Sequence, residues 1–290
     1  MSVILVTGAT SGIGRHAALH LAQRGHTVVA TGRRQDALDT LLAEAADLDL
    51  HVQPLDVTNP QSIAAAHARV LALTDGHGVD VLVNNAGYGQ AGAVMDVSDT
   101  LVRRQYDTNV FGLLAVTRTF ATEMMARGAG RIVNVSSIGG RLSMPLTGVY
   151  TSTKFAVEGL SDAMRIELAP MGIRVVVVEP GAINTRFNAT LTQTSAQMPS
   201  DSPWSSIYDA SDALIASFES AAPGPAPVSR AITKAAESRW PRARYVAPGY
   251  LAPVVSLVAR LPSLVVDTFF HYAFGFGQTR RTVDAQEVAA

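Results

Sequence analysis

Short apolar runs rich in β-branched residues alternate with longer segments of helical periodicity from residue 2 to about residue 180. Most of these runs are continuous rather than alternately polar and apolar, which is typical of strands covered by helices on both faces. Repeated strand–helix–strand units of this kind build parallel sheets. The pattern predicts an α/β fold with a doubly wound, Rossmann-like parallel sheet, whose strands lie at residues 2–7, 26–31, 51–56, 79–84, 130–136 and 173–179.

The pattern changes after Pro180 and Gly181. Residues 188–206 are rich in Thr, Ser, Gln and Pro and indicate a loop, whereas 207–220 and 228–238 again have helical periodicity, and 244–249 fits one more strand. We interpret this region as a helical C-terminal elaboration of a single domain, 1–290. The polar segment leaves the carboxyl end of the sixth strand, so we predict a mobile substrate lid over 188–220.

The composition excludes several classes of function. Only 16% of the residues are charged, the formal net charge is -1 and no basic block is present, so nucleic acid is not an expected partner. The absence of cysteine excludes disulfides, thiolate nucleophiles and thiolate metal ligands. The N-terminus lacks the charged region and cleavage site of a secretory signal, and we therefore expect a cytoplasmic protein.

The segment 251–276 is an apolar C-terminal tail: 17 of its 26 residues are apolar, and residues 240–276 hold 8 of the 18 aromatic residues. An apolar segment of this kind is expected to be buried against another surface. Three such surfaces stay open: the substrate cleft, a second subunit of a homo-oligomer, or a membrane surface. A transmembrane helix is not expected, because polar residues and prolines interrupt the run of about 20 apolar residues that spanning needs. These are Pro253, Arg260, Pro262 and Asp267. Peripheral membrane contact stays open.

A glycine-rich loop, residues 7–14 with the sequence TGATSGIG, follows the first expected strand and opens the first expected helix. Gly8 permits a tight turn, Gly12 lets the backbone approach a pyrophosphate, and Gly14 allows close helix packing. The helix N-terminus then faces the negative charge. An ordinary glycine-rich turn is the alternative, but the strand and helix on either side favour a dinucleotide-binding loop.

The end of the second expected strand bears on the choice of cofactor. Gly32 stands where an acidic residue would bind the adenosine 2′-hydroxyl, and Arg33 and Arg34 follow it. Guanidinium groups match a 2′-phosphate, which favours NADP(H) over NAD(H). A solvated basic turn is the alternative. Asp56, at the end of the third strand, is a candidate to bind the adenine amino group or to cap the turn that follows.

Tyr150 and Lys154 lie four residues apart in a segment of helical periodicity, so their side chains share one face. Ser137 follows the fifth strand, 13 residues before Tyr150. Hydride transfer to a carbonyl carbon needs a proton at the oxygen, and a free tyrosine, with a pKa of about 10, is a poor base near neutrality. The charge of Lys154, with that of an oxidised nicotinamide, is expected to lower the pKa of Tyr150; about 3 units correspond to roughly 4 kcal/mol.

Several motifs occur in order along residues 1–187: TGxxxGxG at 7–14, Asn84-Asn85-Ala86-Gly87, Asn109, Ser137, Tyr150xxxLys154 and Pro180-Gly181. Together they resemble the short-chain dehydrogenase/reductase family. The segments 136–160 and 238–249 are also similar to the branch that contains 17β-hydroxysteroid and retinol dehydrogenases.

The resemblance implies roles for the residues that match. Ser137 would hydrogen-bond the substrate oxygen and Tyr150 would be the acid/base. Lys154 would also bind the nicotinamide ribose, and Asn109 would anchor a water that continues the proton relay. The cofactor contacts implied in this way, together with those argued above, are Gly8, Thr10, Ser11, Gly12, Ile13, Gly14, Arg33, Arg34, Asp56, Val57, Asn84, Ala86, Gly87, Tyr150, Lys154, Pro180, Gly181, Ile183 and Thr185.

The expected function is that of an NADP-dependent oxidoreductase interconverting a secondary alcohol and a ketone, or an alcohol and an aldehyde, on a lipophilic substrate. A non-catalytic dinucleotide-binding sensor or scaffold is the main alternative, although a sensor has no need of a proton relay. An epimerase or dehydratase of the extended branch usually has a larger substrate domain and a GxxGxxG loop. No metal is expected, since His16 and His20 have no converging ligands, and no GxSxG motif supports hydrolase chemistry.

Overall fold

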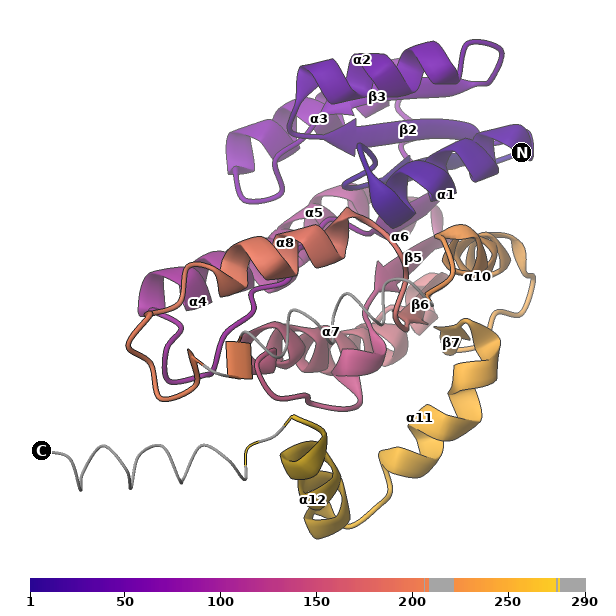
Figure 1. The fold of residues 1–290 in the computed structure, drawn as a ribbon. Helices are drawn as coiled ribbons and strands as arrows, with labels where there is room; N and C mark the ends of the chain where they lie inside the picture. Colours follow the sequence, from indigo (N-terminus) through magenta and orange to yellow (C-terminus); the bar gives the residue numbers. More distant parts are fainter. Residues whose placement is uncertain (206, 209–221, 275, 277–290) are drawn as a thin grey trace, which may run out of the picture.

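The computed structural model describes residues 1–205, 207–208, 222–274 and 276. Seven parallel strands form one sheet in the order β3-β2-β1-β4-β5-β6-β7 (Figure 1). The six predicted strands and the additional one are confirmed, and the strand order reverses between β1 and β4. The strands are β1 (Val3–Val6), β2 (Thr27–Gly32), β3 (Leu50–Pro54), β4 (Val81–Asn84), β5 (Gly130–Val135), β6 (Ile173–Pro180) and β7 (Arg244–Ala247).

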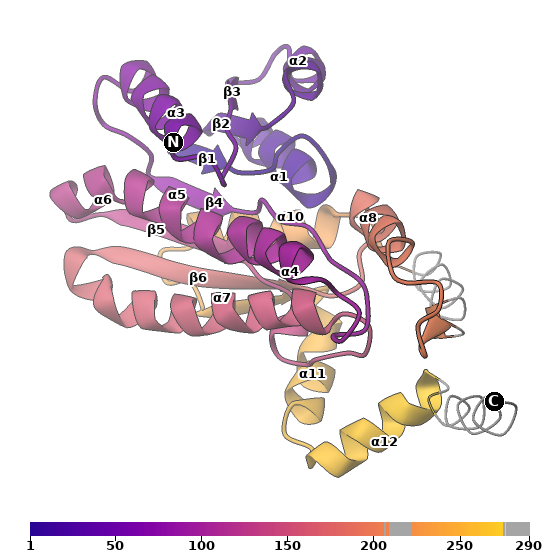
Figure 2. The same cartoon turned by 90° about the vertical axis from the view of Figure 1, so that its left-hand side faces the viewer.

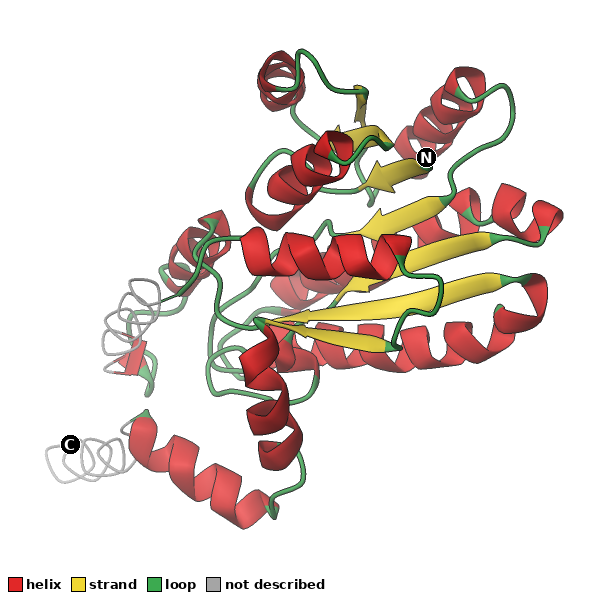
Figure 3. Cartoon of the chain, turned by 90° about the vertical axis from the view of Figure 1, so that its right-hand side faces the viewer, coloured by secondary structure: helices red, strands yellow, loops and turns green. Residues whose placement is uncertain are grey.

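Helices cover both faces of the sheet, as the continuous apolar strands require (Figures 2 and 3). Successive strand residues serve opposite faces: Ile4 and Val6 pack with one group of helices, and Leu5 packs with the other. The first group consists of α1 (Gly12–Gln23), α2 (Gln35–Glu44) and α10 (Ala226–Glu237). The second consists of α3 (Pro60–Leu73), α5 (Leu113–Phe120), α6 (Thr122–Arg127) and α7 (Gly148–Glu167).

Most of the remaining elements surround the carboxyl edge of the sheet or follow β7, and one short 3₁₀ helix joins α7 to the start of β6. They are α4 (Asp99–Tyr106), the π-helix η1 (Asp107–Gly112), the short 3₁₀ helices η2 (Ile138–Gly140), η3 (Ala169–Met171) and η4 (Gly249–Leu251), and the helices α8 (Arg186–Ser195), α11 (Ala252–Val258) and α12 (Ser263–Ala273). The expected helical C-terminal elaboration is therefore present.

Residues 188–206 differ from the expected loop, because α8 occupies the first part of the segment. Thr185 caps this helix by accepting a hydrogen bond from the Phe187 amide at 3.3 Å. The hydroxyl groups of Thr190 and Thr194 donate to backbone carbonyls three or four residues earlier, so polar residues are accommodated within the helix. Part of the predicted lid, residues 206 and 209–220, lies outside the described residues, and its mobility stays a prediction.

The tail forms two helices that stand away from the sheet beyond the end of β7 (Figure 3). Large apolar side chains on them are exposed, including Leu257, Leu264, Phe269 and Tyr272. Phe276 packs beside a small buried cluster of Ala93, Leu146, Ile207 and Tyr208. Within the described residues, no single helix has the length and apolarity to cross a membrane; Gly249–Val258 and Ser263–Ala273 pass that test only as a pair, bent by 115°.

Candidate active site

The glycine-rich loop joins β1 to α1 at the carboxyl edge of the sheet, next to the reversal of strand order, where ligands of open α/β sheets bind. Gly8 and Gly12 have φ angles of +66° and +54°, which favour glycine. A Cβ on Gly14 would overlap the Gly8 carbonyl oxygen. Ser11 precedes α1 without a side-chain cap, and the first turn holds no acidic residue, so the helix N-terminus suits a pyrophosphate.

The segment after β4 is tied to this loop by side chains. The Asn85 amide donates to the carbonyl oxygens of Thr7 and Gly8 at 2.9 and 3.2 Å. The Thr7 hydroxyl in turn accepts from the backbone amides of Asn85 and Ala86 at 2.9 and 3.0 Å. Thr7 was not predicted as a site residue, although its place at the strand end was visible. These bonds place Ala86 beside Gly8.

Asn84 was predicted to bind the cofactor, but its side chain lies inside the protein. Its amide nitrogen donates to Thr117 at 2.8 Å and to Asn134 at 2.9 Å, and the residue is buried. Both amide hydrogens therefore join β4 to its neighbours. The Asn84 side chain is therefore held in the core, and cofactor binding by Asn84 stays a prediction.

At the adenosine end of the expected site, the side chain of Thr10 occupies the space next to Gly32. A Cβ on Gly32 would overlap the methyl group of Thr10 from the glycine-rich loop, so a larger residue at position 32 would require the Thr10 side chain to move. Arg33 is exposed and forms no ion pair within the described part of the chain. Arg34 lies 3.5 Å from Asp36. Arg33 is thus the freer of the two guanidinium groups.

Asp56 caps the turn after β3: one of its oxygens accepts from the amide and the hydroxyl of Thr58 at 2.9 and 2.7 Å. The turn-cap alternative is therefore observed, and cofactor binding by Asp56 stays a prediction. The carbonyl oxygen and one methyl group of Val57 would each lie 2.8 Å from a Cβ atom built on Gly112, so Val57 packs closely against this glycine. Ile13 packs against the core, so its contribution to a cofactor site rests on its backbone.

The chain leaving β6 returns over the glycine-rich loop. A Cβ atom built on Gly12 would lie 3.4 Å from the Cβ atom of Thr185. Ile183 is buried in the core beside it. The Gly181 amide donates to the Ala247 carbonyl at 2.9 Å, which ties the end of β6 to β7. The structure thus brings residues 180–185 to the same edge as the loop, as predicted from their order.

Ser137, Tyr150 and Lys154 also meet at this edge. Ser137 caps η2, two residues after the end of β5, where its hydroxyl accepts from the Gly139 amide at 3.0 Å and donates to the Pro180 carbonyl at 3.4 Å. Tyr150 and Lys154 are both buried in the first turns of α7. The Lys154 ammonium donates to the Val135 carbonyl at 3.0 Å and lies 5.8 Å from the centre of the Tyr150 ring.

Burial shifts the pKa of both Tyr150 and Lys154 in the chain alone, and the expected lowering of the Tyr150 pKa by Lys154 together with an oxidised nicotinamide stays a prediction. Burial raises the pKa of Tyr150 to about 12, although hydrogen bonding by Ser137 acts in the opposite direction. Burial also lowers the pKa of Lys154 to about 8, opposed by the charge of Glu158. Desolvation is the largest cause of both shifts, and it favours the neutral form of each group, which for Tyr150 is the protonated phenol.

Asn109 lies in the π-helix η1, a local widening of the helix that is frequent at functional sites. Its amide nitrogen donates to the Tyr88 carbonyl at 3.0 Å and to the Thr153 hydroxyl at 3.1 Å, and its oxygen accepts from the Tyr88 amide at 3.2 Å. A Cβ on Gly87 would lie 3.0 Å from the Asn109 oxygen and 3.8 Å from the Lys154 ammonium. Gly87 thus brings Asn109 and Lys154 together.

Two residues near Tyr150 were not predicted. The ring of Phe187 from α8 lies 5.2 Å from the ring of Tyr150, tilted by 58°. Thr153 on α7 accepts the hydrogen bond from Asn109. Phe187 could have been found only by knowing that α8 folds back over α7, because nothing in the sequence near residue 187 marks a contact with residue 150.

The predicted absence of a metal concerns His16 and His20 on α1. His16 hydrogen-bonds Ser229 at 2.8 Å, and the two imidazole rings are 6.3 Å apart. Among the residues that the structure describes, no three His, Asp or Glu side chains come together as a metal site would require. His16 thus contacts Ser229 on α10, and the expected absence of a metal stays a prediction.

A comparison with models of known protein families agrees with these observations. It bears on the motifs, the strand order and the grouping of Ser137, Tyr150 and Lys154. The profile of the short chain dehydrogenase family matches residues 2–196. The chain belongs to the short-chain dehydrogenase/reductase family. The match ends before α10 and β7, so the C-terminal third of this family member lies outside the matched region.

Individual family members extend the likeness to the C-terminal third. Retinol dehydrogenase 8 of Bos taurus is 33% identical over 271 residues, which cover 90% of this chain and 86% of that protein. This relative agrees with the predicted similarity to the retinol and steroid dehydrogenase branch.

Solved structures of the family differ in cofactor. The closed form of a serine dehydrogenase complexed with NADP⁺ is 30% identical with a TM-score of 0.73, and covers 84% of this chain and 93% of its own. A Burkholderia phymatum short-chain dehydrogenase/reductase in complex with NAD is 26% identical with a TM-score of 0.76, and covers 88% and 92%.

Proposed function

We propose that this short-chain dehydrogenase/reductase uses NADP(H) to interconvert a secondary alcohol and a ketone, or an alcohol and an aldehyde, on a lipophilic substrate. The observation that carries the proposal is the convergence of Ser137, Tyr150 and Lys154 beside the glycine-rich loop, with Asn109 and Lys154 meeting at Gly87. A binding-only sensor would need the loop but has no use for a buried phenol, hydroxyl and ammonium in one place.

The proposed reaction uses these side chains for proton transfer, and a bound nicotinamide would supply the hydride chemistry. In the reductive direction, the Tyr150 phenol donates its proton to the carbonyl oxygen, while the Ser137 hydroxyl hydrogen-bonds that oxygen. The raised pKa of Tyr150 suits this direction, because the phenol holds its proton at neutral pH. Lys154 supplies positive charge as the phenol becomes anionic, and Asn109 fixes the Tyr88 backbone beside it.

A screen of NADPH oxidation against ketones, aldehydes and steroids tests the proposed function directly. Turnover with at least one carbonyl compound, and its loss on substitution of Tyr150, are the expected results. Tight NADPH binding with no turnover across the panel would favour the sensor alternative.

The preference for NADP(H) rests on Gly32, Thr10 and Arg33. Gly32 carries no carboxylate to oppose a 2′-phosphate, its neighbour Thr10 fills the adjacent space, and the exposed Arg33 has no ion pair among the described residues. We expect Arg33→Ala to weaken NADPH binding by about 1.5–3 kcal/mol, the size of a charge-assisted hydrogen bond, and to leave NADH binding nearly unchanged. Dissociation constants of both cofactors check this. Arg34→Ala, whose partner is Asp36, is the matched control with the smaller expected change.

Apolar side chains next to Tyr150 favour a lipophilic substrate. Phe187 packs on the Tyr150 ring, and a Cβ on Gly89 would lie 2.6 Å from a methyl group of Leu191, so α8 presents an apolar face to this region. Phe276, near the end of the tail, lies beside the cluster of Ala93, Leu146, Ile207 and Tyr208. We therefore favour the substrate side as the cover of the tail over a second subunit or a membrane.

Ending the chain after Leu261 removes α12 and the residues beyond it while keeping η4 and α11. We expect this truncation to raise KM for lipophilic ketones much more than for small ones, because an apolar wall beside the cleft is lost. Steady-state kinetics with a homologous series of ketones measure the effect. An unchanged KM profile with an altered oligomer mass, or with lost binding to phospholipid vesicles, would contradict the substrate-side assignment.

A further inference from the structure

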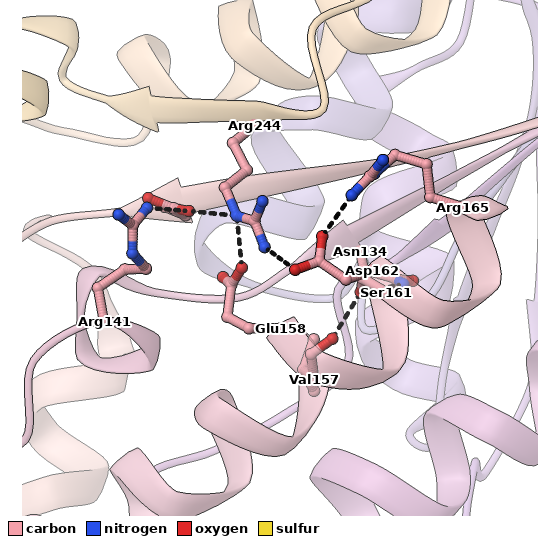
Figure 4. A network of polar contacts seen from close by, with 9 residues as sticks. Asn134, Arg141, Val157, Glu158, Ser161, Asp162, Arg165 and Arg244 are labelled. Atoms are coloured by element: carbon pink, nitrogen blue, oxygen red, sulfur yellow. Dashed lines mark hydrogen bonds and ion pairs between the residues drawn. The ribbon is translucent and has the colours of Figure 1, made fainter. Parts of the chain in front are cut away.

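A partly buried network of charged side chains joins α7 to β6 and β7 (Figure 4). Arg244 on β7 contacts Glu158 on α7 at 2.9 Å, Asp162 one turn further on at 2.6 Å, and Glu179 on β6 at 3.3 Å. The side chain of Glu179 is completely buried and that of Glu158 is 8% exposed, whereas that of Asp162 is 43% exposed. Arg244 is therefore the charge that two buried carboxylates share.

Glu158 is four residues after Lys154 on α7, so the two side chains lie on one face of the helix, about 5 to 6 Å apart at Cβ. One oxygen of Glu158, Oε2, accepts from Arg244, while the other, Oε1, is buried without a hydrogen-bond partner among the described residues. A Cβ atom built on Gly140 would lie 2.9 Å from Glu158 Cγ and 3.0 Å from the Lys154 carbonyl oxygen. Because residue 140 is glycine, it places no side chain between Glu158 and the Lys154 backbone.

We propose that Glu158 is a positioning residue for Lys154, and that Arg244, from outside the family-matched region, fixes Glu158 in that place. Glu158 keeps the buried ammonium charged, and Arg244 prevents the carboxylate from turning to solvent. The significance of this unit for proton transfer rests on the proposed function. Its electrostatic effect on Lys154 is a property of the folded chain and is measurable without turnover.

The other groups around Lys154 leave Glu158 as its source of negative charge. Tyr150 faces it from α7 and is protonated near neutrality, while Ser137 from η2 and Asn109 from η1 are neutral. The carbonyl of Val135 from β5 accepts its hydrogen bond. Within the described residues, the charge of Glu158 is the one that opposes the lowering of the Lys154 pKa by burial.

The pKa of Lys154 can be measured directly, because the chain contains only two lysines, Lys154 and Lys234. Protein labelled with ¹³C at the lysine Cε position gives two signals, and exposed Lys234 serves as an internal reference. We expect Glu158→Gln to lower the pKa of Lys154 by about one unit, the low end of what the loss of an opposite charge produces, because it removes the charge that raises this pKa. Asp162→Asn is the matched control: it removes a carboxylate from the same helix and the same arginine, and should leave the titration unchanged.

A Lys154 titration that Glu158→Gln does not move, or that Asp162→Asn moves equally, overturns the proposal. Should Glu158→Gln fail to fold, the triple variant Glu158→Gln, Glu179→Gln, Arg244→Met leaves none of these three charges in place, and the same downward shift is expected in it. The alkaline limb of kcat/KM should move to lower pH with the Lys154 pKa. Absence of any NADPH-dependent turnover in the wild type would refute the proposed function, while the titration would still decide the role of Glu158.

Discussion

Tyr150→Phe is expected to reduce turnover by about 100-fold or more while NADPH binding changes by no more than about three-fold, because it removes only the proton donor. The buried ring and its packing against Phe187 are retained, so the cofactor edge should keep its shape. Single-turnover rates with NADPH and a reactive ketone, together with the NADPH dissociation constant, measure the two effects separately.

Tyr245→Phe provides the matched control. It removes a phenol oxygen from β7 that accepts a hydrogen bond from the Arg242 amide at 3.1 Å, far from the glycine-rich loop. Its turnover should stay close to that of the wild type. If Tyr150→Phe keeps more than about a tenth of the wild-type rate, general acid catalysis by this phenol is excluded, because the loss falls well below that expected for a catalytic acid.

Arg244→Met is expected to destabilise the fold by about 3–5 kcal/mol, because it leaves two buried carboxylates without their shared counter-charge. Burial, reinforced by the neighbouring charge of Glu158, already raises the pKa of Glu179 while Arg244 is present. Arg141, 3.3 Å from Glu179, is the remaining partner of that carboxylate within the described network. Urea unfolding followed by circular dichroism gives the free energy of unfolding.

Two variants show whether the loss comes from unpaired charge. Adding Glu158→Gln and Glu179→Gln to Arg244→Met should restore most of the stability, since the two buried side chains that lost Arg244 then carry no charge to desolvate. Arg165→Met removes the exposed pair with Asp162 from the same network and should cost less than about 1 kcal/mol. Equal losses for Arg165→Met and Arg244→Met would contradict the buried-charge explanation.

The parts of the fold that depend on neighbouring residues could be predicted from the sequence. The strands follow from continuous apolar runs, and the shared face of Tyr150 and Lys154 follows from their spacing of four. The glycine-rich loop was recognisable because its glycines stand between a strand and a helix. In each case the pattern and the structure it specifies occupy the same few residues.

The parts that depend on distant residues could not be predicted in this way. Arg244 meets Glu158 across 86 positions of sequence, and the raised pKa of Tyr150 reflects burial created by several elements. Asn84 matches a family motif, yet its amide turns inward to Thr117 and Asn134. The helix α8 was missed because its threonines satisfy backbone carbonyls, which no count of polar residues reveals.

The contact between Thr10 and Gly32 couples the residue at the end of β2 to the glycine-rich loop. An aspartate at position 32, the simplest route to binding a free 2′-hydroxyl, would place its Cβ atom 2.4 Å from the Thr10 methyl group, so the Thr10 side chain would have to move. Under the proposed preference for NADP(H), a switch of coenzyme at this position therefore involves residue 10 as well as residue 32.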